Sequence, residues 1–487
     1  MIKRTNTKRI AFLCALVFIA SVLASACSVL PEGAELPTPT PEQYTEEQLN
    51  TPVITIGEYV VTFGEYLNFF NNVAAFYRQN YNFDITEDPE TLAQYKEKIT
   101  QTLAQDKLLL YRADELGLTD LTEEQLKEID ERYQNKVKEM YEYYTALAEK
   151  DKESNDEIDI DKRVEQYILD EAKQQIGSDA TVEAYLEFLK ESERDGYIIE
   201  LLFKEITKNV TISQKDVADW YAEAMDDDVK YYTENPGEYK TEREMFDMYG
   251  TISDYETAVP PLLVPEGYSR VLHIFTTAEG EYSDEYEDNE ERMSELAKEY
   301  GKLALEDSIS GKNTNKKRLE EIAEEYKDLK EANKKEHTRL FKNAKKKIEE
   351  AYEKLQNGAD FAEVMLEYSE DGAIINYEKM QKEGLLISTK HKAKEDWSDI
   401  AKAEFAKLKK GEYSKIFMDD DGYHIIFYLA DETPGKLKLD DVSDIIIAYL
   451  LPKQQDEFYN KQVEEWMKDE DKIIQINNEL IDKIGKK

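Results

Sequence analysis

The chain has 487 residues, of which 63 are Lys or Arg and 106 are Asp or Glu, giving a formal net charge of −43. Such acidity argues against nucleic acid or anionic lipid surfaces as partners, because both are bound through cationic patches. Hydrophobic residues make up 41% of the sequence, enough for two or three cores, and 19 glycines and 12 prolines are few for this length. The composition therefore predicts a mostly helical protein.

The first 26 residues are typical of a secretory signal peptide. Four basic residues lie within positions 3–9, an apolar run covers 10–23, and three small residues precede Cys27. The apolar run of roughly 15 residues is short for a transmembrane helix. The sequence Ala24-Ser25-Ala26-Cys27 resembles the bacterial lipoprotein box, whose cysteine is acylated and becomes the new N-terminus. Cys27 is therefore the predicted lipidation site; ordinary cleavage beside a bystander cysteine is the alternative.

Residues 27–52 are predicted to form an extended spacer behind the lipid. Five prolines fall between Pro31 and Pro52. Such a segment disfavours helix and central strand and forms a semi-rigid connection. At about 3 Å per residue, it would hold the folded part several nanometres from a bilayer.

Residues 53–225 are predicted to form a helical module that opens with a β-hairpin. Strands are expected at 53–56 and 59–62, joined at Gly57-Glu58. Periodic apolar positions then predict helices at about 63–76, 90–116, 122–150, 163–176, 181–189, 194–210 and 216–225. The charged, tyrosine-rich segment 226–267 is interpreted as a linker.

Residues 268–430 have a mixed pattern that predicts strands and helices together. Strands are expected at 269–275 and 385–387, short helices at 361–368 and 397–408, and a hairpin across 419–422. Between the first strand and the first short helix, 279–343 is highly charged with a helical period, broken near Gly311. This predicts two long helices inserted as a protruding hairpin or coiled coil. Apolar helices are expected over 431–487.

Four motifs within 268–430 resemble parvulin-type peptidyl-prolyl isomerases. They are the strand Val271-Leu272-His273-Ile274, the paired-helix segment 355–371, the turn 409–414 and the final strand 422–426. The flanking segments 53–70 and 210–221 and the tail around Trp466 resemble the chaperone module of PrsA and SurA foldases. The resemblance implies an α+β, predominantly helical fold. A SurA-N-like module, completed by the C-terminal helices 431–487, would accompany a parvulin-like domain that carries the 279–343 insertion.

The resemblance also implies a site. In parvulins two histidines lie beneath the proline pocket and a Cys or Asp faces the carbonyl; the matching positions are His273, His424 and Asp371. The family's glycine-rich stretch is reduced to 383–387, and its pocket Met and Phe have no clear equivalents. The candidates for the pocket are Leu385, Trp397, Ile400 and Phe417. The other two histidines, His337 and His391, stand in lysine-rich sequence and are expected to be solvated.

The chain is thus interpreted as a foldase, a prolyl isomerase and chaperone for unfolded or nascent secreted polypeptides. It would be held by its lipid on the extracytoplasmic face of the cell membrane. Prolyl isomerisation has a barrier of about 18–20 kcal/mol and needs neither metal nor cofactor, so none is expected. A holdase with a degenerate isomerase domain is the alternative. A solute-binding lipoprotein is disfavoured because it would alternate strands and helices and contain many glycines. The sequence carries no indication of oligomeric state.

Overall fold

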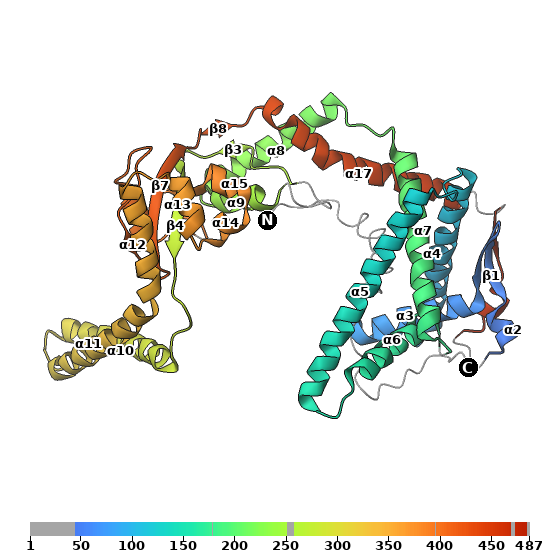
Figure 1. The fold of residues 1–487 in the computed structure, drawn as a ribbon, viewed down its shortest axis with the longest axis horizontal. Helices are drawn as coiled ribbons and strands as arrows, with labels where there is room; N and C mark the ends of the chain where they lie inside the picture. The colour runs from blue at the N-terminus through green and yellow to red at the C-terminus, as the bar shows by residue number, and fades with distance from the viewer. Residues whose placement is uncertain (1–43, 178, 251–257, 395, 469–472, 485–487) are drawn as a thin grey trace. The chain divides into compact units, whose positions relative to one another are not determined.

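The computed structural model describes residues 44–177, 179–250, 258–394, 396–468 and 473–484 (Figure 1). Helices predominate, and the strands of the described part form three small antiparallel sheets, which confirms the predicted α+β class. The chain divides into two compact units, one comprising Met1–Val210 with Gln454–Lys487 and the other Thr211–Lys453. The predicted signal peptide, Cys27 and the spacer up to residue 43 lie outside the described residues.

The sheet of the first unit joins the two ends of the chain. β1 (Pro52–Ile56) turns through Gly57 into β2 (Tyr59–Thr62), as predicted, and β9 (Ile474–Ile476) pairs with the other edge of β1. Gly57 has a φ of +59°, a conformation that glycine adopts at little cost. A helix was expected across 474–476, and this is wrong. Three β-branched isoleucines among four residues, 473–476, favour the strand.

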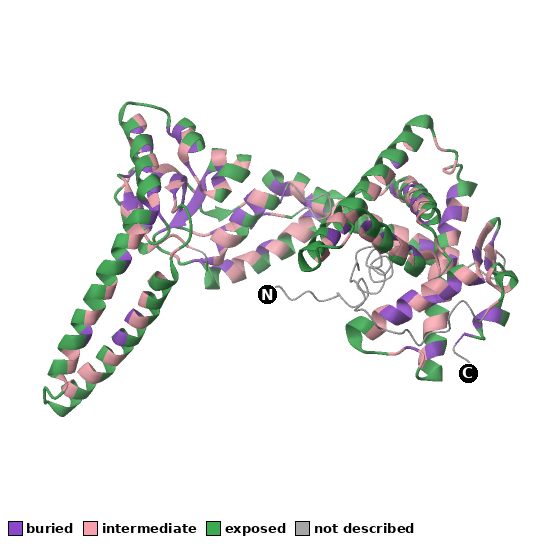
Figure 2. Ribbon diagram, turned by 60° about the horizontal axis from the view of Figure 1, so that its bottom comes forward, coloured by how far each residue is buried: buried purple, intermediate pink, exposed green. Residues whose placement is uncertain are grey.

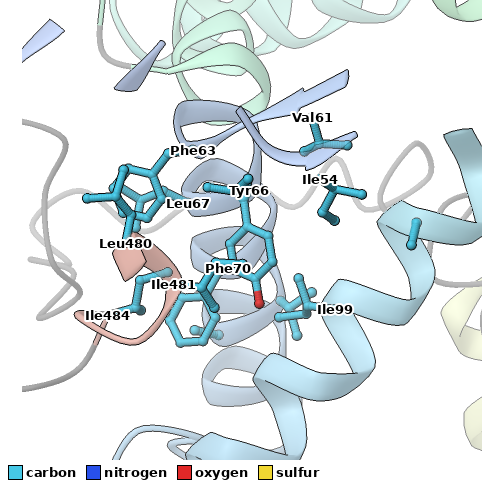
Figure 3. Close-up of a cluster of buried hydrophobic side chains, with 14 of the residues drawn as sticks. Ile54, Val61, Phe63, Tyr66, Leu67, Phe70, Ile99, Leu480, Ile481 and Ile484 are labelled. Carbon is cyan, nitrogen blue, oxygen red and sulfur yellow. The ribbon is translucent and has the colours of Figure 1, made fainter. Parts of the chain in front are cut away.

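Long helices make up most of this unit, and the first two of them pack on the sheet. They are α3 (Phe63–Tyr81), α4 (Pro89–Glu115), α5 (Glu123–Ser154), α6 (Ile160–Ile176) and α7 (Val182–Thr207). α3 begins in a capping box, because Thr62 accepts a hydrogen bond from the Glu65 amide while Glu65 reaches back to Thr62. Figure 3 shows a core of this unit, in which side chains of α3 meet β1, α4 and the short C-terminal α18 (Asn478–Ile481). The C-terminal segment therefore completes the hydrophobic core of the first unit.

The predicted spacer ends sooner than expected. α2 (Glu46–Leu49) lies inside it, capped by Thr45, and the ring of Tyr44 contacts Phe63 edge-on at 4.9 Å between centroids. Residues from Tyr44 onward thus belong to the folded unit rather than to an extended connection. The capping box formed by Thr45 and Gln48 is the sequence signal for this helix.

The expected linker, 226–267, instead contains helix. α8 (Gln214–Glu234) continues into it and α9 (Glu238–Tyr249) follows, and both belong to the second unit. The reason is that the tyrosines of this segment are core residues: Tyr232 and Tyr239 are almost fully buried. The predicted module 53–225 likewise exceeds the first unit, which ends at Val210.

The C-terminal helices also differ from expectation. α17 (Leu439–Lys468) is one helix with Pro452 inside it, and only its part from Gln454 belongs to the first unit. Its earlier residues Val442 and Ile446 pack with Val217 and Met225 of α8. Residues 439–453 thus pack on α8 within the second unit, at positions of α8 that lie inside the predicted module 53–225.

The second unit is organised around a four-stranded antiparallel sheet of order β5-β4-β7-β6. Its strands are β4 (Tyr268–Thr276), β5 (Leu385–Ser388), β6 (Phe417–Met418) and β7 (Tyr423–Asp431). The helices around it are α12 (Lys342–Gln356), α13 (Phe361–Tyr368), α14 (Gly372–Asn376), α15 (Glu378–Glu383) and α16 (Asp399–Phe405). β3 (Leu263–Val264) and β8 (Gly435–Lys436) form a separate pair. A dry cluster including Ile274, Ile348 and Ile425 fills the space between this sheet and its helices.

The inserted hairpin is confirmed. α10 (Asp284–Ser310) and α11 (Lys316–Leu340) pack against each other, and Gly311 ends α10 in a left-handed conformation with φ +66°. Figure 2 shows that most of both helices is exposed. Among the helices that the structure describes, none has the length and apolar character needed to cross a bilayer.

Candidate active site

Two histidines meet on one face of the sheet because of strand register. β4 and β7 are antiparallel, with His273 opposite Ile426 and Phe275 opposite His424. His273 and His424 are therefore diagonal neighbours on the same face. Their ring planes are nearly parallel, with centroids 5.2 Å apart, and His273 Nε2 lies 3.0 Å from His424 Nδ1. Both residues are only 5% exposed, so this is a buried imidazole pair.

Asp371 joins the pair from the loop between α13 and α14. Its Oδ2 lies 2.6 Å from His273 Nδ1, while its Oδ1 accepts from the Ala373 amide and caps α14. Ser369 fixes this loop to β4, because its hydroxyl donates to the His273 carbonyl and accepts from the Phe275 amide. Asp371 is thus held by both its own helix and the strand that carries His273.

Asp419 holds the other end of the pair. Its Oδ1 lies 2.7 Å from His424 Nε2, and its Oδ2 accepts a hydrogen bond of 2.6 Å from Ser398. The four side chains therefore form a continuous line, Asp371–His273–His424–Asp419. Asp419 was not among the site residues predicted from the sequence. Its signal was the acidic turn directly before His424, whose register places Asp419 beside that ring.

Each hydrogen bond along this line requires one proton on the atom that donates it. Three bonds need three protons, whereas two neutral imidazoles with ionised carboxylates supply two. Burial lowers the pKa of His424, and the neighbouring His273 lowers it further. Burial would raise the pKa of Asp371, but its hydrogen bond to His273 and the charge of that ring hold the pKa below its ordinary value. A neutral His424 can donate from Nε2 to Asp419 and accept at Nδ1, which fixes its tautomer.

Aromatic rings enclose the imidazoles. Trp397 contacts His273 edge-on with centroids 4.8 Å apart, and Phe417 stacks on His424 at 5.0 Å. Phe275 lies 4.9 Å from His424 and 5.7 Å from His273. Phe275 was also missed, although it follows His273 by two residues on one strand and so shares its face. A charged, hydrogen-bonded line thus lies within apolar walls.

Only some of the predicted pocket residues lie beside the histidines. Trp397 and Phe417 contact the histidines directly, as described, and Leu385 is buried in the core beside β4. Ile400 is 47% exposed, so the structure does not bring it to the histidines. The reason is helical phase: α16 turns Ala401 and Phe405, four residues apart, toward the core and Ile400 outward.

The remaining histidines are not simply solvated, contrary to expectation. His337 Nδ1 lies 2.7 Å from the Tyr282 hydroxyl and its ring packs on Phe341, and burial lowers the pKa of His337. His391 Nε2 lies 2.8 Å from the Glu266 carbonyl. Over the described residues, no group of three or more His, Cys, Asp or Glu is arranged to hold a metal ion.

Comparison with known proteins agrees with this geometry. The family described as "Rotamase: PPIC-type PPIASE domain" matches residues 328–430. The match includes Asp371, Asp419 and His424, whereas β4 and His273 lie before it, separated by α10 and the first part of α11. No curated protein matches the chain.

Several solved structures are similar at low identity. PrsA from Bacillus subtilis is 16% identical, with 86% of this chain and 93% of that chain covered and a TM-score of 0.22. PrsA from Streptococcus pneumoniae is 13% identical, with 88% and 97% covered and a TM-score of 0.23. PrsA from Bacillus anthracis is 17% identical, with 69% and 99% covered and a TM-score of 0.17. TM-scores this low carry no argument, so the assignment of the domain rests on the family match.

Proposed function

Because residues 328–430 form a parvulin-type peptidyl-prolyl isomerase domain, we propose that the chain is a foldase that catalyses prolyl cis–trans isomerisation in unfolded secreted proteins. The observation that carries the proposal is the Asp371–His273–His424–Asp419 line beneath aromatic walls. His273, His424 and Asp371 are the proposed catalytic residues, and Leu385, Trp397 and Phe417 are the proposed pocket.

The chemistry asked of this site is modest. The planar prolyl amide owes its barrier, about 18–20 kcal/mol, to resonance that is lost in the twisted state. A twisted amide is therefore less polar than a planar one, and apolar walls that exclude water favour it. The histidine line beneath those walls supplies fixed hydrogen bonds, so the site need not reorganise as the amide rotates. No covalent step is required.

The test of this function is a proline-peptide isomerisation assay on the full mature chain. His424→Ala and Asp371→Ala should each lower kcat/KM by about tenfold or more, which corresponds to about 1.4 kcal/mol of barrier. His391→Gln is the matched control, since His391 is a histidine of the same unit bonded to the Glu266 carbonyl rather than to the line. Circular dichroism and urea unfolding of each variant separate lost chemistry from lost folding. Wild-type protein that does not exceed the uncatalysed rate with any residue before proline would refute the enzyme.

The chaperone part of the proposal has a separate test. A holdase binds unfolded chains without accelerating rotation, so suppression of aggregation should survive His424→Ala. If the wild type suppresses aggregation but shows no isomerisation, the non-catalytic holdase becomes the function. If it suppresses none, the chaperone role is lost and the isomerase stands alone.

We also propose that the chain works outside the cytoplasm, attached to the cell membrane by a lipid on Cys27. The support is the signal-like segment 1–26 and the lipoprotein-box resemblance at Ala24–Cys27. A lipid anchor would keep the foldase where secreted chains emerge unfolded. Expressed in a bacterium, the chain should incorporate labelled fatty acid and partition with membranes, and Cys27→Ser should abolish both. Label that persists in Cys27→Ser would show that Cys27 is not the attachment site.

A further inference from the structure

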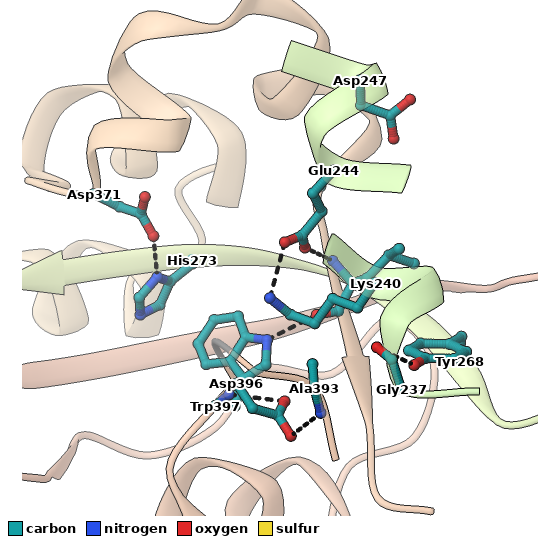
Figure 4. Close-up of polar contacts among 12 residues, drawn as sticks. Gly237, Lys240, Glu244, Asp247, Tyr268, His273, Asp371, Ala393, Asp396 and Trp397 are labelled. Carbon is teal, nitrogen blue, oxygen red and sulfur yellow. Dashed lines mark hydrogen bonds and ion pairs between the residues drawn. The ribbon is translucent and has the colours of Figure 1, made fainter. Parts of the chain in front are cut away.

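Strand β5 forms one edge of the parvulin sheet, and its outward backbone groups are covered by side chains. The Leu386 amide donates to Glu244 Oε1 at 2.7 Å, and the Leu386 carbonyl accepts from Trp397 Nε1 at 2.8 Å. Figure 4 shows both contacts, with Glu244 coming from α9 and Trp397 from the loop before α16. A single residue of the edge strand therefore links α9 to the tryptophan that contacts His273.

Glu244 is firmly held at its end of this link. It is 9% exposed, and its Oε2 pairs with Lys240 Nζ at 2.8 Å. One turn further along α9, Asp247 pairs with Arg270 of β4 at 2.9 Å and with Lys379 at 2.8 Å. α9 is thus bonded to both β4 and β5, and Glu244 has a fixed position relative to the sheet.

Trp397 depends on such support because its ring is only partly buried. Its loop is fixed on one side by Asp396, which accepts from the amides of Ala393 and Trp397 and pairs with Lys402. On the other side it lies against Gly237, the residue before α9. A Cβ at Gly237 would come within 2.1 Å of the Lys392 carbonyl oxygen. The segment that begins at Gly237 therefore supports both the loop and the strand that orient Trp397.

We propose that Glu244 is a positioning residue of the isomerase site. By holding the Leu386 amide, it fixes the carbonyl that binds the Trp397 indole, and so sets this aromatic wall against His273. The inference rests on the proposed function. It goes beyond it because α9 lies outside residues 328–430, the part that matches the family. The isomerase unit of this chain then includes 237–249, the segment that joins it to α8.

The test compares two substitutions at one position in the full mature chain. Glu244→Gln retains a carbonyl oxygen for the Leu386 amide, whereas Glu244→Ala leaves that buried amide without a partner. We expect Glu244→Ala to lower kcat/KM about fivefold or more and Glu244→Gln to stay within about twofold of wild type. Glu238→Ala, at the half-buried first position of the same helix, is the matched control and should match wild type. If Glu244→Ala folds and equals wild type in kcat/KM, the proposal is overturned.

A double-mutant cycle and a spectroscopic signal distinguish positioning from a general loss of stability. If Glu244 acts through Trp397, then Glu244→Ala should add no further loss of kcat/KM in a Trp397→Phe background. Additive losses would contradict the proposal. The Trp397 indole N–H resonance, assigned by its absence in Trp397→Phe, should shift in Glu244→Ala while those of Trp220 and Trp466 stay in place. If the wild type shows no isomerase activity, the proposed function fails, and this resonance alone decides whether Glu244 positions Trp397.

Discussion

In the second unit, the parvulin sheet and the inserted hairpin each contain an ion pair between a carboxylate and an arginine. The pair is buried in the sheet region and exposed in the hairpin. In the sheet region, the side chains of Asp247 and Arg270 are 0% and 6% exposed and 2.9 Å apart. In the hairpin, Glu299 and Arg318 form a two-pronged pair at 2.7 Å, but their side chains are 38% and 40% exposed. A buried charge needs its partner, whereas an exposed one has water as a substitute. The first pair fixes α9 on the sheet, and the second contributes little to holding α10 on α11.

The hairpin gains its order from other sources. A narrow apolar seam includes Met293, Leu296 and Ile322. Within this seam Asn333 is 5% exposed and hydrogen-bonds to the side chain of Asn289 and the carbonyl of Tyr286. A buried asparagine favours the one register in which it is satisfied. The two helices of the hairpin are thus held in one register by contacts of their own.

The largest loss of stability is expected from removing the Asp247 carboxylate. Asp247→Ala should destabilise the second unit by about 3–5 kcal/mol, because it leaves Arg270 buried with one carboxylate fewer. Burial would raise the pKa of Asp247, but the charges of Arg243, Arg270 and Lys379 hold it below its ordinary value, so it is ionised where these pairs form. Urea unfolding of the full chain, followed by tryptophan fluorescence, measures the loss.

Asp247→Asn is the control for size. It keeps the volume and removes the charge, so it should also destabilise, but by less than the alanine variant. A loss under about 1 kcal/mol for Asp247→Ala, the range of exposed pairs, would remove the distinction between the two regions.

A smaller effect is expected at Asp419, whose side chain is less buried than that of Asp247 and less exposed than that of Glu299. Asp419→Asn should cost about 1 kcal/mol near neutral pH, because it weakens a charge-assisted hydrogen bond to His424. Burial would raise the pKa of Asp419, but Ser398 and His424 hold it below its ordinary value. The carboxylate therefore stabilises the fold above its unfolded pKa, and that stability is lost as the pH falls through its folded pKa.

The pH dependence gives the measurement. Urea midpoints of wild type and Asp419→Asn should differ at pH 7 and converge as the pH falls below the folded pKa of Asp419, where the carboxylate is protonated. Nitrogen chemical shifts of the histidines add a second reading, since His424 should lose its fixed Nε2–H tautomer in the variant. A difference in stability that stays constant across this range would show that Asp419 acts through packing rather than charge.

The sequence predicted the elements of the parvulin region because local patterns and register agree there. The resemblance to the parvulin strands, together with the glycine turn between β6 and β7, predicted His273 and His424 on facing strands, and the register agrees. The prediction of a linker over residues 226–250 was wrong. It rested on the charge and tyrosine content of the segment, but Tyr232 and Tyr239 are buried by residues distant in the sequence. β9 shows the same limit, since β1 supplies its partner from the other end of the chain.

The site was predictable mainly where a motif carried it. Asp371 follows a paired-helix motif, and Asp419 lies in an acidic turn five residues before His424, whereas Glu244 acts over a sequence distance that no short motif encodes. Ile400 was placed at the pocket by counting residues, and one residue of helical phase was enough to turn it outward. Positions that depend on the exact start of a helix cannot be fixed from spacing alone.

The smallest expected effect is in the hairpin. Glu299→Ala removes the two-pronged partner of Arg318, yet stability should change far less than in Asp247→Ala, because both groups regain water. The difference in stability between Glu299→Ala and wild type should become smaller as salt is added, since exposed pairs are screened over about 10 Å at 0.1 M. Urea unfolding of Glu299→Ala and wild type at low and high NaCl measures this, and Glu320→Ala, in the more exposed pair with Lys316, is the matched control. A large, salt-independent loss for Glu299→Ala alone would mean that this pair determines how α10 and α11 pack, and the two regions would then be held by the same means.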